Sequence, residues 1–255
     1  MCIREEVNYM SDIFSKQYEV HYYDCDYRLK CNLPSLVNFF CDIGNAHSES
    51  VGDTIPKLIE NNMVWVFYKY DIKVKRYPNY REKVKVETFA MSFNKFYAHR
   101  GYRVIAEDGE VIAEAVSLFF LINIKRRRPM RIPDREIELY GAEELVGKEI
   151  DMDKIPEVER EDVITEFNIR YSDIDSNGHV NNVKYMEWAI ESVPQDIVKD
   201  HELKRIRVDF DKETTYGNKV TIATDIIQRE DKIITIHSIR ENNDKELTKL
   251  QIEWE

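Results

Sequence analysis

The sequence predicts an α+β fold in which one unit occurs twice, each copy a curled antiparallel sheet around a long helix. The first observation is an internal repeat, in which six residues recur 149 positions later along the chain. They are Tyr18, Val20, Tyr22, Asp24, Asp26 and Asn32, which recur as Phe167, Ile169, Tyr171, Asp173, Asp175 and Asn181. The second is that each copy combines one apolar stripe of helical spacing with several runs of strand spacing. The third is the short links, such as Asp108-Gly109, which are typical of antiparallel hairpins.

The first copy is expected to begin with an alternating strand, followed by a D-x-D turn and the long helix. This helix carries a stripe of five apolar residues at helical spacing, Leu33, Leu36, Val37, Phe40 and Ile43. Alternating apolar residues then predict four further strands, near residues 63–76, 82–92, 96–107 and 110–124.

The second copy repeats this order. Its helix carries the stripe Val183, Met186, Ile190 and Val193 and is ended by Pro194. Its strands are expected at residues 163–171, 203–213, 218–228, 232–240 and 246–254. Downstream of the helix the copies match at an offset of 136 instead of 149, so the first copy holds an insertion of 13 residues. We expect this insertion around Gly52–Asn62, where Thr54-Ile55-Pro56 would begin a short second helix.

The chain therefore divides into two units and a connector, at residues 1–124, 125–161 and 162–255. The connector contains Pro129, Pro133 and Pro156 and little apolar periodicity, which indicates an extended segment on the outside of the molecule. It begins with a basic run, Lys125, Arg126, Arg127 and Arg128, with Arg131 and Arg135 close behind. Such a run is either a solvated face or a docking patch for an acidic partner.

The composition excludes several classes of protein. The 255 residues carry a net charge of −11, which disfavours nucleic-acid binding, and no stretch is apolar enough to span a membrane. Residues 1–20 resemble neither a secretory signal nor a transit peptide. The four cysteines are Cys2, Cys25, Cys31 and Cys41, and they lack C-x-x-C spacing. This favours buried thiols in a reducing cytoplasm over disulfides or a zinc site.

The candidate chemistry lies where the two copies differ, in the turn that contains Asp175, Asn177 and His179. The first copy has Arg28 and Lys30 at the positions of Asn177 and His179. A carboxylate, an amide and an imidazole at a strand-to-helix turn could orient a water and a carbonyl group. Spacing alone leaves open the alternative that Asp175 and Asn177 only cap the helix. A calcium loop is disfavoured, because its twelfth position is a lysine instead of a glutamate.

The segment from Tyr171 to Glu191, with D-x-D-x-N-G-H-V-N-N-V-K-Y, closely resembles the signature of acyl-acyl-carrier-protein (acyl-ACP) thioesterases. These are proteins of two tandem hotdog domains. The first copy resembles the same family at Val74–Pro78, Val84–Thr88 and Ala115–Leu118, and the likeness covers about 240 residues from Phe14 onward. The duplication makes the resemblance specific, since single-hotdog thioesterases share only the D-x-x-G-H-V-N-N portion.

The resemblance implies a catalytic set of Asp175, Asn177, His179 and Glu213. Thr214 follows the glutamate where plant members usually carry a cysteine, so a cysteine mechanism at this position is excluded. The implied roles are activation of water by Glu213, relayed by His179, and polarisation of the thioester carbonyl by Asn177 and the helix amides near Val180. Asp175 would either hold this array or attack directly.

Two features of the strands bear on this assignment. Glu213 has the opposite parity to Ile206, Val208 and Phe210, so a bulge or a site facing the other copy is needed to bring it to the turn. The first copy lacks the polar set and is rich in aromatic residues, which either line the acyl tunnel or pack the core: Trp65, Phe67, Tyr68, Tyr70 and Phe89.

The resemblance implies hydrolysis of the acyl-ACP thioester, which releases free fatty acid and ends chain elongation. The first unit would bind the acyl chain and the second would be catalytic. The alternatives are an acyl-CoA thioesterase and a non-catalytic acyl-binding protein. We expect no cofactor or metal, acyl carrier protein as the partner at the basic run, no nucleic acid or stable membrane anchor, a cytoplasmic location, and either a monomer or a homodimer.

Overall fold

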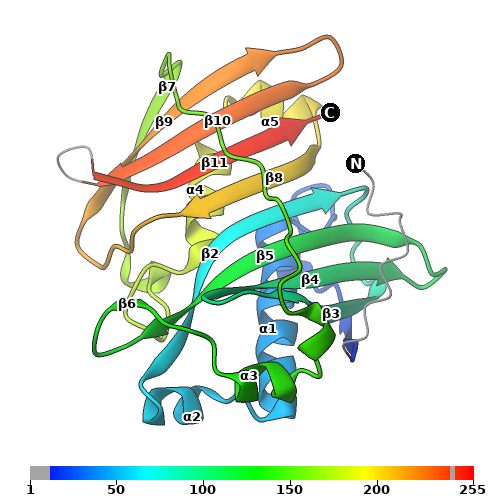
Figure 1. Ribbon diagram of the computed structural model, residues 1–255. Coiled ribbons are helices and arrows are strands. Elements are labelled where there is room, and N and C mark those ends of the chain that lie inside the picture. The colour runs from blue at the N-terminus through cyan, green and yellow to red at the C-terminus, as the bar shows by residue number, and fades with distance from the viewer. Residues whose placement is uncertain (1–11, 242–244) are drawn as a thin grey trace.

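The computed structural model describes residues 12–241 and 245–255, so the predictions for residues 1–11 and for Cys2 lie outside the described residues. The described chain forms one antiparallel sheet of eleven strands (Figure 1). The strand order is β1-β3-β4-β5-β2-β8-β11-β10-β9-β7, with the short β6 paired to β5. The order is a palindrome of two five-strand halves, as the predicted repeat requires.

The first half contains β1 (Phe14–Glu19), α1 (Leu33–Val51), α2 (Ile55–Glu60), β2 (Met63–Val74), β3 (Lys83–Phe93), β4 (Tyr97–Ala106) and β5 (Val111–Asn123). The second contains β7 (Val163–Asn168), α4 (Asn182–Glu191), α5 (Gln195–Asp200), β8 (Leu203–Phe210), β9 (Lys219–Gln228), β10 (Ile233–Glu241) and β11 (Lys245–Trp254). The strands predicted by residue range begin and end within three residues of the observed ones.

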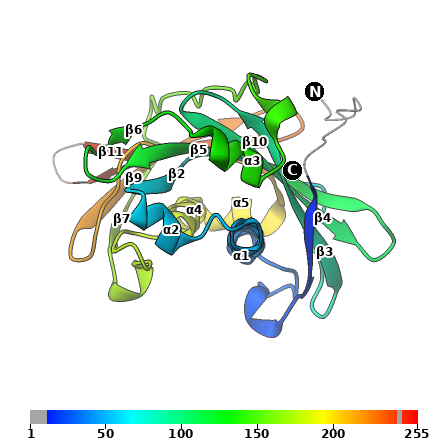
Figure 2. The ribbon, with the colours of Figure 1, turned by 60° about the horizontal axis from the view of Figure 1, so that its bottom comes forward.

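The two halves join edge to edge through β2 and β8, where Tyr70 pairs with Val208 and Ile72 with Ile206. Helices α1, α4 and α5 lie on the same side of this sheet, as Figure 2 shows, and α1 contacts α4. The apolar stripe of α1 is buried along its whole length, and on α4 Val183 and Met186 are buried. The main core therefore lies between the sheet and the two long helices, in the predicted α+β arrangement, and a second, smaller apolar cluster lies around α2 and the start of β2.

Hydrogen bonds confirm the repeat at atomic detail. The helix N-caps are Asn32 and Asn181. Each donates its backbone N–H over 2.9 Å to the backbone carbonyl of the aspartate eight positions earlier, Asp24 or Asp173. The matching bonds Val20 N to Glu82 O and Ile169 N to Asn218 O are both 3.0 Å. These pairs keep the offsets of 149 and 136 that the sequence shows.

The 13 additional residues of the first copy do not lie where the sequence placed them. Both copies have a six-residue second helix, α2 and α5, and the links on either side of it are equally long. Helix α1 has 19 residues and α4 has 10, while β2 has 12 and β8 has 8. The prediction of an inserted helix around Gly52–Asn62 is therefore wrong, because nine residues lengthen α1 and four lengthen the start of β2.

The connector was predicted to be an extended segment, and this prediction is wrong for its first part. That part contains β6 (Arg128–Pro129), α3 (Asp134–Leu139) and a 3₁₀ turn at Glu143–Leu145. The connector then crosses the face of the second half-sheet opposite the helices (Figures 1 and 2). The buried carboxylate of Asp225 fixes its end, accepting the backbone N–H groups of Glu159, Arg160 and Glu161 over 2.7, 2.9 and 2.7 Å. Three such bonds replace the hydration that burial removes from the carboxylate.

Two further findings concern predictions made from composition. Cys31 is buried and Cys25 is half-buried, but Cys41 is exposed, so the prediction of buried thiols is wrong for Cys41. All three are free. Within residues 12–241 and 245–255, none of the helices has the length and apolar character needed to cross a bilayer.

Candidate active site

The turn before α4 carries three of the four predicted site residues. A single antiparallel bridge between Ile174 and Val180 closes it, and Asp175 N donates to His179 O over 2.8 Å. Gly178 supplies the left-handed conformation that this tight turn needs, with φ of 81°. In the first copy Leu29 takes the equivalent position at φ of 57°, so the same turn is built there at a steric cost.

Asp175 and Asn177 do not cap the helix, and that alternative is therefore wrong. The N-cap is Asn181, whose side-chain oxygen accepts from Val183 N over 2.9 Å. The Asp175 carboxylate instead accepts the backbone N–H of Asn177 over 2.8 Å, which holds the turn. Asp26 makes the equivalent bond to Arg28 N in the first copy, also over 2.8 Å.

Glu213 lies opposite this turn, and its Oε2 is 3.3 Å from His179 Nε2. The side chains of His179 and Glu213 are 42% and 53% exposed, so water reaches both. Two bonds flank the pair, Val180 N to Thr214 O and Thr215 Oγ1 to Gly178 O, each 3.0 Å long. The two loops are thus tied together on both sides of the imidazole–carboxylate contact.

The parity difficulty for Glu213 disappears because β8 ends at Phe210. The next two amides, of Asp211 and Lys212, both donate to Leu247 O, over 2.9 and 3.0 Å. Two residues facing one partner is the pattern of a β-bulge, which redirects the chain. Glu213 follows in an irregular loop and is free of the strand alternation.

One predicted donor is not available. The backbone N–H of Val180 is engaged by Thr214 O, so it cannot also polarise a substrate carbonyl. The prediction that helix amides polarise the carbonyl is therefore wrong for the amide of Val180 itself. The side-chain amide of Asn177 remains, because Asn177 is exposed and lines an apolar cavity that reaches the turn.

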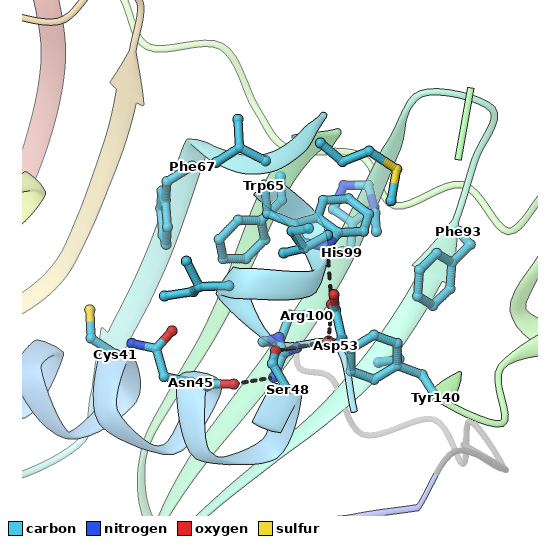
Figure 3. A pocket seen from close by; sticks show the side chains of 18 of the residues that line it. Cys41, Asn45, Ser48, Asp53, Trp65, Phe67, Phe93, His99, Arg100 and Tyr140 are labelled. Atoms are coloured by element: carbon cyan, nitrogen blue, oxygen red, sulfur yellow. Dashed lines mark hydrogen bonds between the residues drawn. The ribbon is translucent and has the colours of Figure 1, made fainter. Parts of the chain in front are cut away.

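That cavity, of about 290 Å³, lies in the first half of the molecule (Figure 3). Residues from α1, α2 and β2 to β5 line it, among them Asn45, Ser48, Ile59, Met63, Trp65, Phe67, Phe93, Arg100 and Phe119. Asn177 is its lining residue from the second half. The cavity therefore runs from the first copy to the turn of the second, as a site for a long apolar group requires.

The lengthened parts of α1 and β2 build much of this cavity. Asn45 and Ser48 lie on the additional turns of α1, and Met63, Val64 and Trp65 lie on the additional residues of β2. Of the aromatic residues predicted for the tunnel, Trp65 and Phe67 line the cavity. The others are absent from its lining, and Tyr70 packs against Phe40 in the core.

A polar cluster that the sequence did not predict lies in the cavity wall. The buried Asp53 accepts hydrogen bonds from Tyr140 Oη over 2.7 Å and from Trp65 Nε1 over 3.1 Å, as Figure 3 shows. Tyr140 Oη also lies 2.8 Å from Ser48 Oγ, and Arg100 Nη2 donates to both hydroxyl groups over 3.3 Å. Burial raises the pKa of Tyr140, which therefore remains a donor. No local pattern reveals the cluster, because Asp53 and Tyr140 are 87 positions apart.

The equivalent position in the first copy contains no comparable site. Arg28 replaces Asn177 and donates to Val198 O over 3.3 Å, and Lys30 replaces His179 and lies 2.8 Å from Glu202 Oε1. Tyr77, at the position of Glu213, is buried and donates to Leu203 O over 3.1 Å. These side chains bind one half of the molecule to the other, and none of them forms an imidazole–carboxylate pair like that of His179 and Glu213.

The basic run Lys125–Arg128 is exposed at the tip of the β5–β6 hairpin. Arg126 N donates to Asn123 Oδ1 over 2.9 Å, which shapes the turn. In the described part of the chain, no carboxylate lies within ion-pair distance of these four cations. Among residues 12–241 and 245–255 there is also no group of three or more His, Cys, Asp or Glu side chains arranged to hold a metal ion.

Comparison with known proteins gives two family matches that together cover most of the chain. Residues 11–140 match the acyl-ACP thioesterase N-terminal domain, and residues 157–255 match the acyl-ACP thioesterase C-terminal domain. A palmitoyl-acyl carrier protein thioesterase of Gossypium hirsutum is 27% identical over 79% of this chain, and an oleoyl-acyl carrier protein thioesterase of Coriandrum sativum is 26% identical over 87%. The chain spans only 52% and 65% of the length of these two plant proteins.

Solved structures agree over nearly the whole chain. A putative oleoyl thioesterase from Lactobacillus plantarum is 26% identical with a TM-score of 0.90, and 96% of each chain is covered. A 12:0-ACP thioesterase from Umbellularia californica has the same fold at 22% identity and a TM-score of 0.85, with 95% of this chain and 94% of that chain covered. Two tandem hotdog domains are the fold that these neighbours share with the chain, as the sequence predicts.

Proposed function

The chain belongs to the acyl-ACP thioesterase family, and on this premise we propose that it hydrolyses acyl-acyl-carrier protein and releases a free fatty acid, ending chain elongation. The observation that carries the proposal is the continuity of the site. Asn177 lines an apolar cavity, and the same turn presents His179 to Glu213. An acyl chain in the first unit would bring its thioester to these residues. In this proposal residues 1–124 bind the chain and residues 162–255 are catalytic.

The proposed reaction is attack of water on the thioester carbonyl carbon. Glu213, with His179 as relay, accepts the proton of the water, and Asn177 donates a hydrogen bond to the carbonyl oxygen as negative charge develops there. The carbon–sulfur bond then breaks, and the thiolate of the carrier receives the proton. Asp175 has the holding role rather than the attacking one, since the non-catalytic copy keeps the same bond at Asp26.

Acyl carrier protein is the proposed partner, and Lys125, Arg126, Arg127 and Arg128 form the proposed docking site. A chain of net charge −11 repels an acidic carrier, so attraction has to come from a local basic surface. The exposed run without ion-pair partners in the described chain supplies one. The proposed location is the cytoplasm, consistent with the three free thiols, and the proposed assembly is a monomer or a homodimer.

The decisive test compares one acyl chain on two carriers, acyl carrier protein and coenzyme A, with the wild-type protein, His179→Ala and Glu213→Ala. We expect faster turnover of the protein-bound substrate and loss of most turnover in both variants, with unchanged melting temperatures. Preference for coenzyme A would favour the acyl-CoA thioesterase alternative. Binding of the acyl thioester without its consumption would identify an acyl-binding protein instead.

A further inference from the structure

A buried carboxylate lies behind the loop that carries Glu213. Glu241, at the end of β10, is only 8% exposed and accepts a hydrogen bond from Thr214 Oγ1 over 2.9 Å. It also accepts from Asn218 Nδ2 and from Lys245 Nζ, the latter over 3.2 Å. Glu241 does not line the acyl cavity, so the roles assigned above do not account for it.

The first copy holds the same loop with a half-buried carboxylate instead, since Glu82 accepts the backbone N–H of Asn79 over 2.9 Å and pairs with Arg76 over 2.9 Å. Pro78 stands at the position of Thr214, and its carbonyl accepts from Cys31 N over 2.8 Å, as Thr214 O does from Val180 N over 3.0 Å. The fixed φ of proline stiffens that loop directly. Burying a carboxylate is costly unless it is hydrogen-bonded, so the burial of Glu241 behind this loop calls for a reason particular to the second copy.

Thr214 is the point at which the two halves of the candidate site meet. It follows Glu213 in the chain, and its carbonyl binds the amide that follows His179. Its buried hydroxyl donates to Glu241, and Asn218 Nδ2 also lies within 3.3 Å of that hydroxyl. Fixing Thr214 therefore fixes the distance between Glu213 and His179, although both of those side chains are exposed.

We propose that Glu241 is a positioning residue that acts through Thr214 to hold the Glu213 carboxylate against His179. This inference rests on the proposed thioesterase function. Small displacements of a reacting group cost up to about 100-fold in rate, so loss of the Thr214–Glu241 bond should lower kcat by roughly 10- to 100-fold. KM should stay within about twofold, because the acyl cavity lies in the other half of the molecule.

The test uses the full chain with an acyl-ACP substrate and four variants. Thr214→Val removes the hydroxyl donor at nearly constant volume, and Thr214→Ser restores it. Glu241→Ala removes the acceptor, and the double variant removes both. We expect a low kcat for Thr214→Val and Glu241→Ala, a kcat within about threefold of wild type for Thr214→Ser, and a double variant no slower than the worse single one, since both act on one bond.

Asp225→Ala is the matched control, because it also removes a buried, hydrogen-bonded carboxylate from the second unit. It should lower the melting temperature and leave kcat unchanged. A kcat near wild type in Thr214→Val would overturn the inference even if Glu241→Ala fails to fold, and so would a Thr214→Ser variant as slow as Thr214→Val. The proposed function fails separately, by full activity of Glu213→Ala or by no hydrolysis in the wild type.

Discussion

On acidification this protein should lose stability at a higher pH than its surface charge suggests, because the second unit buries an uncharged histidine. His237 on β10 has no exposed surface, and its ring nitrogens contact only hydroxyl groups, those of Ser192, Thr224 and Thr235. Burial lowers the pKa of His237 from 6.5 to about 3. A protonated imidazole has no anionic partner among these neighbours, so the folded state binds the proton far more weakly than the unfolded state does.

The sign and size of the effect follow from linkage. A lowered pKa in the folded state gives stability that is complete above about pH 6.5 and is lost as the pH falls from there toward 3. Each unit of pH below 6.5 costs about 1.4 kcal/mol, so His237 should lose about 2 kcal/mol between pH 7.5 and pH 5. His47 and His99, whose pKa values burial lowers to about 4, should add to this loss.

Urea unfolding at pH 7.5 and pH 5 measures this difference. The variant His237→Gln keeps a neutral polar group, and its free energy of unfolding should fall by about 2 kcal/mol less than that of the wild type over this interval. His21→Gln, at an exposed position, is the matched control and should keep the wild-type dependence. Equal losses in the wild type and His237→Gln would refute the reasoning.

Three further changes have defined outcomes. Reversing the charges at residues 126–128 to glutamate should raise KM for the carrier-bound substrate about tenfold and leave KM for a small thioester unchanged; steady-state kinetics on both substrates decides between docking and mere solvation. Asp53→Ala leaves Tyr140 Oη and Trp65 Nε1 without their acceptor and should cost about 2 to 4 kcal/mol in urea unfolding, whereas a loss below 0.5 kcal/mol would show that water replaces the carboxylate. Asp225→Ala frees three amides of the connector and should speed proteolysis near residues 157–161, measured by mass spectrometry; unchanged cleavage would mean that the neighbouring ion pairs suffice.

The sequence predicted the periodic elements well because their signals are local. The helical stripe from Leu33 to Ile43 and the alternation in β2 to β5 can be recognised from neighbouring residues alone. The same patterns recur in the second copy, which supports each assignment independently. The total length of the insertion could be counted, but its division between α1 and β2 could not, because an offset does not show where residues are added. Pro56 correctly indicated the short helix α2, but the second copy has the equivalent helix α5 after Pro194, so α2 is not part of the insertion.

The site was predictable only in part. The motif around His179 is contiguous, so its residues could be named, and the family resemblance supplied Glu213, 34 positions away. The Asp53–Tyr140 pair joins a loop of the first unit to the connector, and no spacing rule links a loop residue to one that follows α3. The exposure of Cys41 has a related cause, since α1 turns this residue toward a cavity that only the folded sheet creates.

The pairing of β2 with β8 makes one polypeptide out of what could otherwise be a symmetric pair of subunits. In a homodimer one gene encodes both partners, so any change that deepens a cavity or removes a catalytic group appears twice. Covalent duplication lifts that restriction. Here one copy has nine more helical residues, while the other has the shorter helix and the His179–Glu213 pair. The joined sheet thus allows a division of labour that point symmetry forbids.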